Sequence, residues 1–242
     1  MYIIVGNFGN HSLAVMQALI EKGLSPIHFV SVDTGWSAAS WAERVQQGTD
    51  YAISQGVVVH RLVPQPAFSE MVISRKQFPS PKFQWCTSFL KGLPILEYLD
   101  EHDPSCEALI VSGKRQQDSR RYNNLQEFEY QNELYQGRTL WHPLWQTKEE
   151  AFVKLIARAG FKVLPHPSLE CSPCIHMALE QLNFLEPLSV KRLQMVEDRV
   201  AQTMFQQPIT QLCTVSKEVK RQEDLSLQQF DSGCGAPWGC GE

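Results

Sequence analysis

Short apolar runs of strand length recur along the first half of the chain. They are Tyr2–Val5, Ile27–Val32, Val57–Leu62 and Glu107–Val111. Runs of four to eight apolar and β-branched residues bounded by turn residues are typical of buried strands. Because longer stretches with helical spacing separate them, the pattern predicts strands that alternate with helices around a parallel sheet.

Helical spacing is clearest between the first two runs. The signals are the apolar residues Val15, Ala18 and Leu19, the N-cap Ser12 and the terminating pair Lys22-Gly23. The stretch Ala38–Ser54 is also expected to be helical. Val63–Phe83 carries four prolines, which favours a long surface loop over regular structure.

The second half of the chain has a helical pattern. One apolar stripe comprises Phe152, Leu155, Ile156 and Ala159, and a second comprises Leu193, Val196 and Val200. The whole pattern therefore predicts an α/β fold with a doubly wound, mostly parallel sheet and a helical C-terminal part. In such sheets, ligands bind at the carboxyl ends of the strands.

Composition narrows the class of protein. The chain has 242 residues, a hydrophobic share of 43% and a net charge of -4, which excludes a disordered acidic chain and a basic nucleic-acid-coating protein. The longest apolar runs are too short to cross a bilayer or to form a signal peptide, so we expect a cytoplasmic protein without a membrane partner. In a reducing compartment, clustered cysteines indicate metal binding or thiol chemistry.

The cysteines form the first candidate site. Cys171 and Cys174 lie in "CSPC", the spacing with which two thiolates bind one metal centre, and Cys86 lies in "QWCTSFLKGLP". Cys234 or Cys240 of the glycine-rich tail would complete four ligands for zinc or an iron–sulfur cluster. An ordinary helix start with two thiols is the simpler alternative. The nearby His166 and His176 are further candidate ligands, whereas Cys106 and Cys213 are expected to be small buried residues.

Polar loops follow three of the predicted strands. "GNFGNHS" spans Gly6 to Ser12, "VDTGW" contains Asp33, and "SGKRQQDSRR" contains Arg115 and Arg121. A glycine-bearing turn into a helix can bind phosphate on the helix N-terminus, and arginine suits phosphate or sulfate. Asp33 could bind a ribose or adenine, or simply end its strand in a turn, and the basic loop could simply be solvated.

The order of these motifs resembles the phosphoadenosine phosphosulfate reductase family of the PP-loop (adenine nucleotide alpha-hydrolase-like) superfamily. The family's S-G-G-x-D-S loop corresponds to "NFGNHS", its V-D-T-G to "VDTGW", its W-C-T-x-x-L-K-x-x-P to "WCTSFLKGLP", and its G-x-R-x-x-E-S-x-x-R to "GKRQQDSRR". A P-L-x-x-W type segment then leads to C-x-x-C, as "HPLWQTKEEAF" precedes "CSPC". The PP-loop is degenerate, because Phe8 replaces a glycine and His11 replaces the acidic residue.

The resemblance implies a site for ATP or an adenylyl-sulfate-type nucleotide. The residues that it assigns to this ligand are Gly6, Asn7, Gly9, Asn10, His11, Ser12, Asp33, Thr34, Gly35, Lys91, Gly113, Arg115 and Arg121. It also implies a 4Fe-4S cluster on Cys86, Cys171 and Cys174, for which we favour Cys234 as the fourth ligand, with zinc as the alternative metal. Cys240 is the candidate nucleophile.

The resemblance also suggests a domain division. Residues 1–145 would form the PP-loop-type nucleotide-binding core, 146–230 a helical part with the CxxC site, and 231–242 a Gly/Cys-rich tail. We expect a protein that acts in sulfur reduction or transfer, with a thiol reductant such as thioredoxin as a candidate partner and a homodimer as a candidate assembly. The alternatives are an ATP-dependent enzyme that modifies nucleic acid with sulfur, and a catalytically silent protein that binds nucleotide and metal.

Overall fold

The computed structural model describes residues 1–213 and Trp238. Cys234, Cys240 and the predicted tail, apart from Trp238, lie outside the described residues. Trp238 itself is buried and packs edge-on against Tyr135, with 4.9 Å between the ring centroids. Within the described part, no helix is both long enough and apolar enough to cross a membrane.

The described residues form a six-stranded sheet in the order β3-β2-β1-β4-β6-β5. The strands are β1 (Tyr2–Val5), β2 (Ile27–Val32), β3 (Val58–Leu62), β4 (Leu109–Val111), β5 (Phe128–Glu129) and β6 (Leu140–Trp141). All neighbouring pairs are parallel except β5 and β6, which are antiparallel. Since β1 lies between β2 and β4, the chain changes direction across the sheet beside β1, and the loops after β1 and β4 meet there.

Helices cover both faces of this sheet. They are α1 (Asn10–Glu21), α2 (Trp41–Ser54), α3 (Phe68–Arg75), α4 (Trp85–Thr87), α5 (Leu93–His102), α6 (Glu149–Arg158) and α7 (Pro187–Val200). A π-helical turn, η1 (Ser88–Gly92), joins α4 to α5. Short 3₁₀ turns are η2 (Gln116–Asp118), η3 (Arg120–Tyr122), η4 (Glu133–Tyr135) and η5 (Leu179–Phe184).

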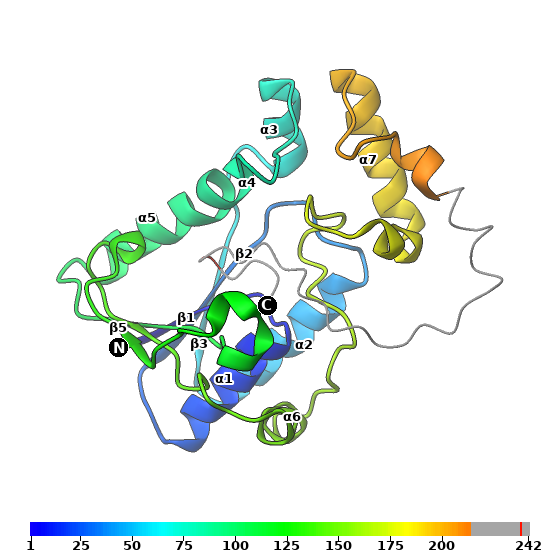
Figure 1. Ribbon diagram of the computed structural model, residues 1–242. Coiled ribbons are helices and arrows are strands. Elements are labelled where there is room, and N and C mark those ends of the chain that lie inside the picture. The colour runs from blue at the N-terminus through cyan, green and yellow to red at the C-terminus, as the bar shows by residue number, and fades with distance from the viewer. Residues whose placement is uncertain (214–237, 239–242) are drawn as a thin grey trace.

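The helices divide into layers. α1, α2 and α6 share one apolar cluster on one face of the sheet, and α5 packs on the other face (Figure 1). α3 and α7 stand together beyond the sheet, where they share a third apolar cluster with η1 (Figure 1). The predicted division at residue 145 stays a prediction, although α6 packs against α1 in the first cluster.

The predicted fold class, a mostly parallel α/β sheet with a helical C-terminal part, is confirmed. The bounds of β1 and β2 are those predicted, because buried parallel strands have continuous apolar sequences. The residues of the α6 stripe are all buried. The prediction that Cys106 is buried is wrong, because its side chain is exposed.

Two expectations about local structure are wrong, and α2 and β4 begin two or three residues later than expected, at Trp41 and Leu109. The proline-rich stretch Val63–Phe83 contains α3, whose first turn is closed by a hydrogen bond from Ala67 N to Glu70 Oε2 at 2.9 Å. α1 begins at Asn10 with Gly9 at the N-cap, so Ser12 lies inside the first turn instead of capping the helix.

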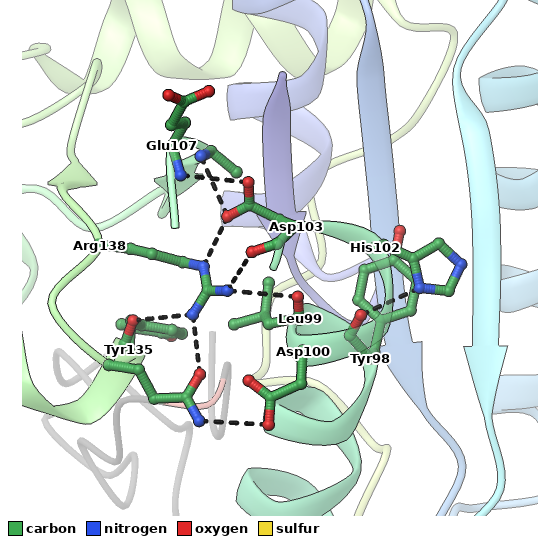
Figure 2. A network of polar contacts seen from close by, with 10 residues as sticks. Tyr98, Leu99, Asp100, His102, Asp103, Glu107, Tyr135 and Arg138 are labelled. Atoms are coloured by element: carbon green, nitrogen blue, oxygen red, sulfur yellow. Dashed lines mark hydrogen bonds and ion pairs between the residues drawn. The ribbon is translucent and has the colours of Figure 1, made fainter. Parts of the chain in front are cut away.

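A buried ion pair holds the β4 and β6 side of the sheet together. Arg138 Nε donates to Asp103 Oδ2 at 2.7 Å, and Arg138 Nη2 donates to the carbonyl oxygens of Asp103 and Leu99 at 2.6 and 3.2 Å (Figure 2). The Asp103 carboxylate also accepts from the backbone N–H groups of Glu107 and Ala108, at 3.1 Å each. The pair therefore joins the end of α5 to the segments that lead into β4 and β6.

Removing the cation should destabilise the fold. We expect Arg138→Met to lower the free energy of unfolding by about 3 kcal/mol, because Asp103 would be left as a buried, partly uncompensated charge. Urea unfolding measures the loss. Arg158→Met is the matched control, since Arg158 makes an exposed pair with Glu21 and should cost much less. Equal losses in the two variants would contradict the role of the buried pair.

Candidate functional site

The loop Gly6–Ser12 joins β1 to α1 in a tight turn. A Cβ atom at Gly6 would lie 2.6 Å from Ser12 Cβ, so glycine is needed there. Gly9 N donates to Asn7 Oδ1 at 2.8 Å, and Ser12 Oγ donates to Gly9 O at 3.3 Å. These bonds fix the loop from within. They set it at the N-terminus of α1, where the first N–H groups of a helix have no intrahelical acceptor and favour an anion.

Phe8 occupies the position of a family glycine without filling the mouth of the loop. Its backbone is left-handed, with φ of 64°, and its side chain is fully buried. The ring stacks on Phe29 of β2, with 4.2 Å between the centroids, and Gly48 of α2 leaves the space that the ring needs. The strain of a left-handed phenylalanine, about 1–2 kcal/mol, is offset by burial of the ring in the core.

His11 belongs to a charged cluster beside the loop. His11 Nε2 lies 2.9 Å from Asp118 Oδ2, and Arg115 Nε donates to Asp118 Oδ1 at 2.9 Å. Arg115 Nη1 lies 2.9 Å from Glu149 Oε2, and the guanidinium lies over the ring of Phe152, 3.7 Å from its centroid. Arg115, an expected anion ligand, is thus buried and already paired with two carboxylates.

Gly113 explains why this cluster meets the loop. A Cβ atom at Gly113 would collide with the carbonyl group of His11, so the loops after β1 and β4 touch through their backbones. Arg121 lies in η3, a few residues further along, and is exposed. The loops after β1 and β4 therefore meet at the carboxyl ends of the strands, as the sequence predicted.

A second part of the site is a cavity of about 450 Å³. Three predicted metal ligands, Cys86, Cys171 and Cys174, line it together with Thr34 and Lys91. Cys86 comes from α4, whereas Cys171 and Cys174 come from the loop before η5. Its apolar walls include Trp36, Phe68 and Leu90. Residues more than 80 positions apart in the sequence therefore meet at one cavity.

Two basic residues hold the walls of this cavity. Lys91 Nζ lies 2.7 Å from Glu170 Oε1, and the pair joins η1, which directly follows the helix of Cys86, to the segment of Cys171. Arg192 of α7 donates to the carbonyl oxygens of Trp36, Ser37 and Ser172, at 2.9, 2.9 and 3.0 Å. Burial lowers the pKa of Arg192, and the charge of Cys171 acts in the opposite direction. Neither Glu170 nor Arg192 was among the predicted site residues.

The segment 164–174 connects the cavity to the loop. Asn10 makes two hydrogen bonds with the backbone of Leu164, each 2.9 Å long, and Asn7 Nδ2 donates to Ser168 Oγ at 2.9 Å. Further along, the same segment lines the cavity and carries both cysteines of "CSPC". Two predicted loop residues, Asn7 and Asn10, thus hold the cysteine segment in place.

Some polar atoms face the cavity without a hydrogen-bond partner among the described residues. They include Thr34 Oγ1 and His176 Nε2. Burial lowers the pKa of His176, and the positive charge of Arg121 lowers it further. Such atoms are available to a ligand.

Asp33 directly follows β2, and its carboxylate already has two partners in the fold. Its carboxylate pairs with Arg61 of β3 and accepts from Gly35 N at 2.9 Å. Gly35 has a left-handed backbone, with φ of 70°, as a tight turn requires. The hydrogen bond from Gly35 N to Asp33 closes the turn after β2, which was the simpler alternative for this residue. The role of Asp33 in binding adenosine stays a prediction.

The metal prediction is not tested by these contacts. Among the described residues, no three His, Cys, Asp or Glu side chains converge as a group that could hold a metal ion. The proposed fourth ligand, Cys234, and the candidate nucleophile, Cys240, lie outside that part of the chain.

Residues 2–172 match the model of the phosphoadenosine phosphosulfate reductase domain. The chain belongs to this family. The match spans both parts of the site, from the loop after β1 to the first cysteine of "CSPC", and it confirms the resemblance on which the predicted site residues rest.

The fold has only weak similarity to the two solved structures described next. The phosphoadenylyl-sulfate (PAPS) reductase of Candida auris, in a phosphate complex, has 16% identity and a TM-score of 0.48, over 67% of this chain and 74% of that one. The NMN synthetase of Francisella tularensis has 12% identity and a TM-score of 0.49, over 93% and 88%. At these scores, neither likeness adds to the family match. No curated protein matches the sequence.

The pH dependence of stability should reveal the Asp118 cluster. Burial alone would raise the pKa of Asp118, but the hydrogen bonds and charges of His11 and Arg115 outweigh it and the pKa is lowered. Ionised Asp118 therefore stabilises the fold at neutral pH, and this contribution is lost as the pH falls below about 4.

We expect Asp118→Asn to be less stable than the wild type at pH 7, with a difference that shrinks toward pH 3. Urea unfolding at the two pH values measures this difference. If it is the same at both, Asp118 does not depend on its cationic neighbours in the way described.

Proposed function

We propose that this member of the phosphoadenosine phosphosulfate reductase domain family binds an adenine nucleotide or sulfonucleotide and carries an iron–sulfur cluster, acting in sulfur reduction or transfer. The observation that carries the proposal is the arrangement of one family-type loop and one cysteine-lined cavity on the same segment, 164–174. A sulfur group bound at the loop would thereby lie close to the thiols.

The nucleotide would use the loop Gly6–Ser12. The N–H groups of the first turn of α1 and the positive end of its dipole would hold the anion, as helix N-termini do elsewhere. The buried ring of Phe8 leaves the loop backbone free for this role. Thr34 Oγ1 is a further donor on the cavity wall, and Arg121 is an exposed cation on the loop after β4.

The cluster would use Cys86, Cys171 and Cys174. These thiols lie in one mainly apolar cavity. They are the ligand type of iron–sulfur clusters, which are held by thiolates and whose reduction potential depends on burial. When bound, the cluster would polarise or position the sulfur group of the ligand. The Lys91–Glu170 pair and Arg192 would keep the two cysteine-bearing segments together. Cys234 stays the predicted fourth ligand.

Other parts of the expected function stay predictions. These are Cys240 as nucleophile, a thiol reductant such as thioredoxin, a nucleic-acid substrate and a homodimer. Zinc stays the alternative metal for the same cysteines, and the metal analysis below separates the two.

Anaerobic purification followed by metal and sulfide analysis tests the cluster. We expect the wild type to contain iron and acid-labile sulfide and to show a broad absorbance near ~400 nm, because thiolate-to-iron charge transfer colours such clusters. Cys86→Ser should lose most of the iron. Cys106→Ser is the matched control, since Cys106 is exposed and is not among the residues that line the cavity, and it should retain the wild-type content.

Two results would contradict the proposal. One is stoichiometric zinc without sulfide in the anaerobic protein, which would indicate a zinc site. The other is equal iron in the Cys86 and Cys106 variants, which would mean that iron binds elsewhere.

A further inference from the structure

Arg115 is a cation that the fold cannot leave uncompensated. Its side chain is only 6% exposed, and its guanidinium lies on the ring of Phe152. Burying an unpaired charge is costly, so the fold supplies two carboxylates, those of Asp118 and Glu149. The formal charges of Arg115, Asp118 and Glu149 sum to -1, so Arg115 presents no unpaired positive charge to a further anion.

The two carboxylates differ in how firmly they are held. Asp118 is 13% exposed and is fixed by His11, by the Arg115 side chain and by Arg115 N, which donates to its Oδ2 at 2.9 Å. The side chain of Glu149 is 64% exposed. It pairs with the outer nitrogen of Arg115, Nη1, and the side-chain oxygen of Gln117 accepts from the same nitrogen at 2.8 Å. Glu149 is therefore the carboxylate that can turn away into solvent without opening the core.

We propose that Glu149 competes with the ligand for Arg115 and so sets the affinity and specificity of the site for anions. The inference rests on the proposed nucleotide binding. Asp118 occupies the Nε and Nη2 atoms of the guanidinium, so a phosphate or sulfate oxygen would approach Nη1, where Glu149 is the charged partner. A ligand has to displace this carboxylate, so a nucleotide with several contacts can enter where a lone inorganic anion cannot.

The location of Glu149 supports this competition. It is the first residue of α6, where the helix dipole favours a carboxylate, so the fold holds Glu149 near Arg115 without burying it. Its neighbour Glu150 pairs instead with Lys154 on the same helix, at 2.6 Å, and both of those side chains are exposed. Glu150 therefore provides a control with the same chemistry and the same helix end.

Calorimetric titration of the full chain with ATP, adenylyl sulfate and inorganic phosphate tests the proposal on the wild type, Glu149→Gln and Glu150→Gln. We expect Glu149→Gln to bind the nucleotides about fivefold more tightly, since one partly exposed opposing charge is removed. It should also gain binding of inorganic phosphate, and the gain should shrink at high salt. Glu150→Gln should bind as the wild type does.

The outcomes separate this inference from the proposed function. Wild-type nucleotide binding that Glu149→Gln leaves unchanged or weakens would overturn the inference alone, as would an equal gain in both variants. Binding by Glu149→Gln without measurable binding by the wild type would support it. Failure of all three proteins to bind any nucleotide would overturn the proposed function and the inference with it.

Discussion

The site depends on the hydrogen bonds by which Asn7 and Asn10 hold the segment 164–174 against the loop after β1. The two asparagines belong to the loop that is expected to bind an anion, and the segment carries the paired cysteines. The loop and the cysteine segment are therefore directly hydrogen-bonded to each other. A conformational change in the loop would act on the cysteine segment through three hydrogen bonds.

Phe8 and His11, the two residues in which the loop departs from the family motif, both have partners in the fold. Phe8 keeps the left-handed backbone that a glycine would adopt and directs its ring into the core, where Gly48 accommodates it. His11 Nε2 contacts Asp118, which stands at the acidic position of the G-x-R-x-x-E-S motif on the loop after β4. The loop thus remains a tight turn into α1 despite these two replacements, and it lies within the residues that match the phosphoadenosine phosphosulfate reductase domain.

The sequence predicted those parts of the fold that local pattern determines. β1 and β2 were found because their apolar residues are contiguous. α3 was missed because its prolines suggested a loop, although Pro64 and Pro66 precede the helix and do not interrupt it. β5 and β6 are two residues each, and the buried Arg138–Asp103 pair that supports their side of the sheet joins residues far apart in sequence.

The candidate site shows the same limit. Motif order identified the three cysteines that line the cavity, and Lys91 and Thr34 with them. It gave no sign that Glu149 would neutralise Arg115, because Glu149 lies in the quoted segment "HPLWQTKEEAF" but at none of its matched positions. Arg192, which holds the cavity wall, lies in no motif, and both residues act across long separations in the chain. Adjacency to Cys171 was the one available signal for Glu170.

The central claim is that the loop Gly6–Ser12 still binds a nucleotide anion and passes the effect to the cysteine segment. Backbone hydrogen exchange of the anaerobic protein, with and without adenylyl sulfate, tests it most directly. The account predicts slower exchange at residues 10–12, where the first turn of α1 would bind the anion, and also at residues 164–169 of the segment that Asn7 and Asn10 hold. Unchanged exchange in both regions at saturating ligand, or protection confined to other parts of the chain, would contradict it.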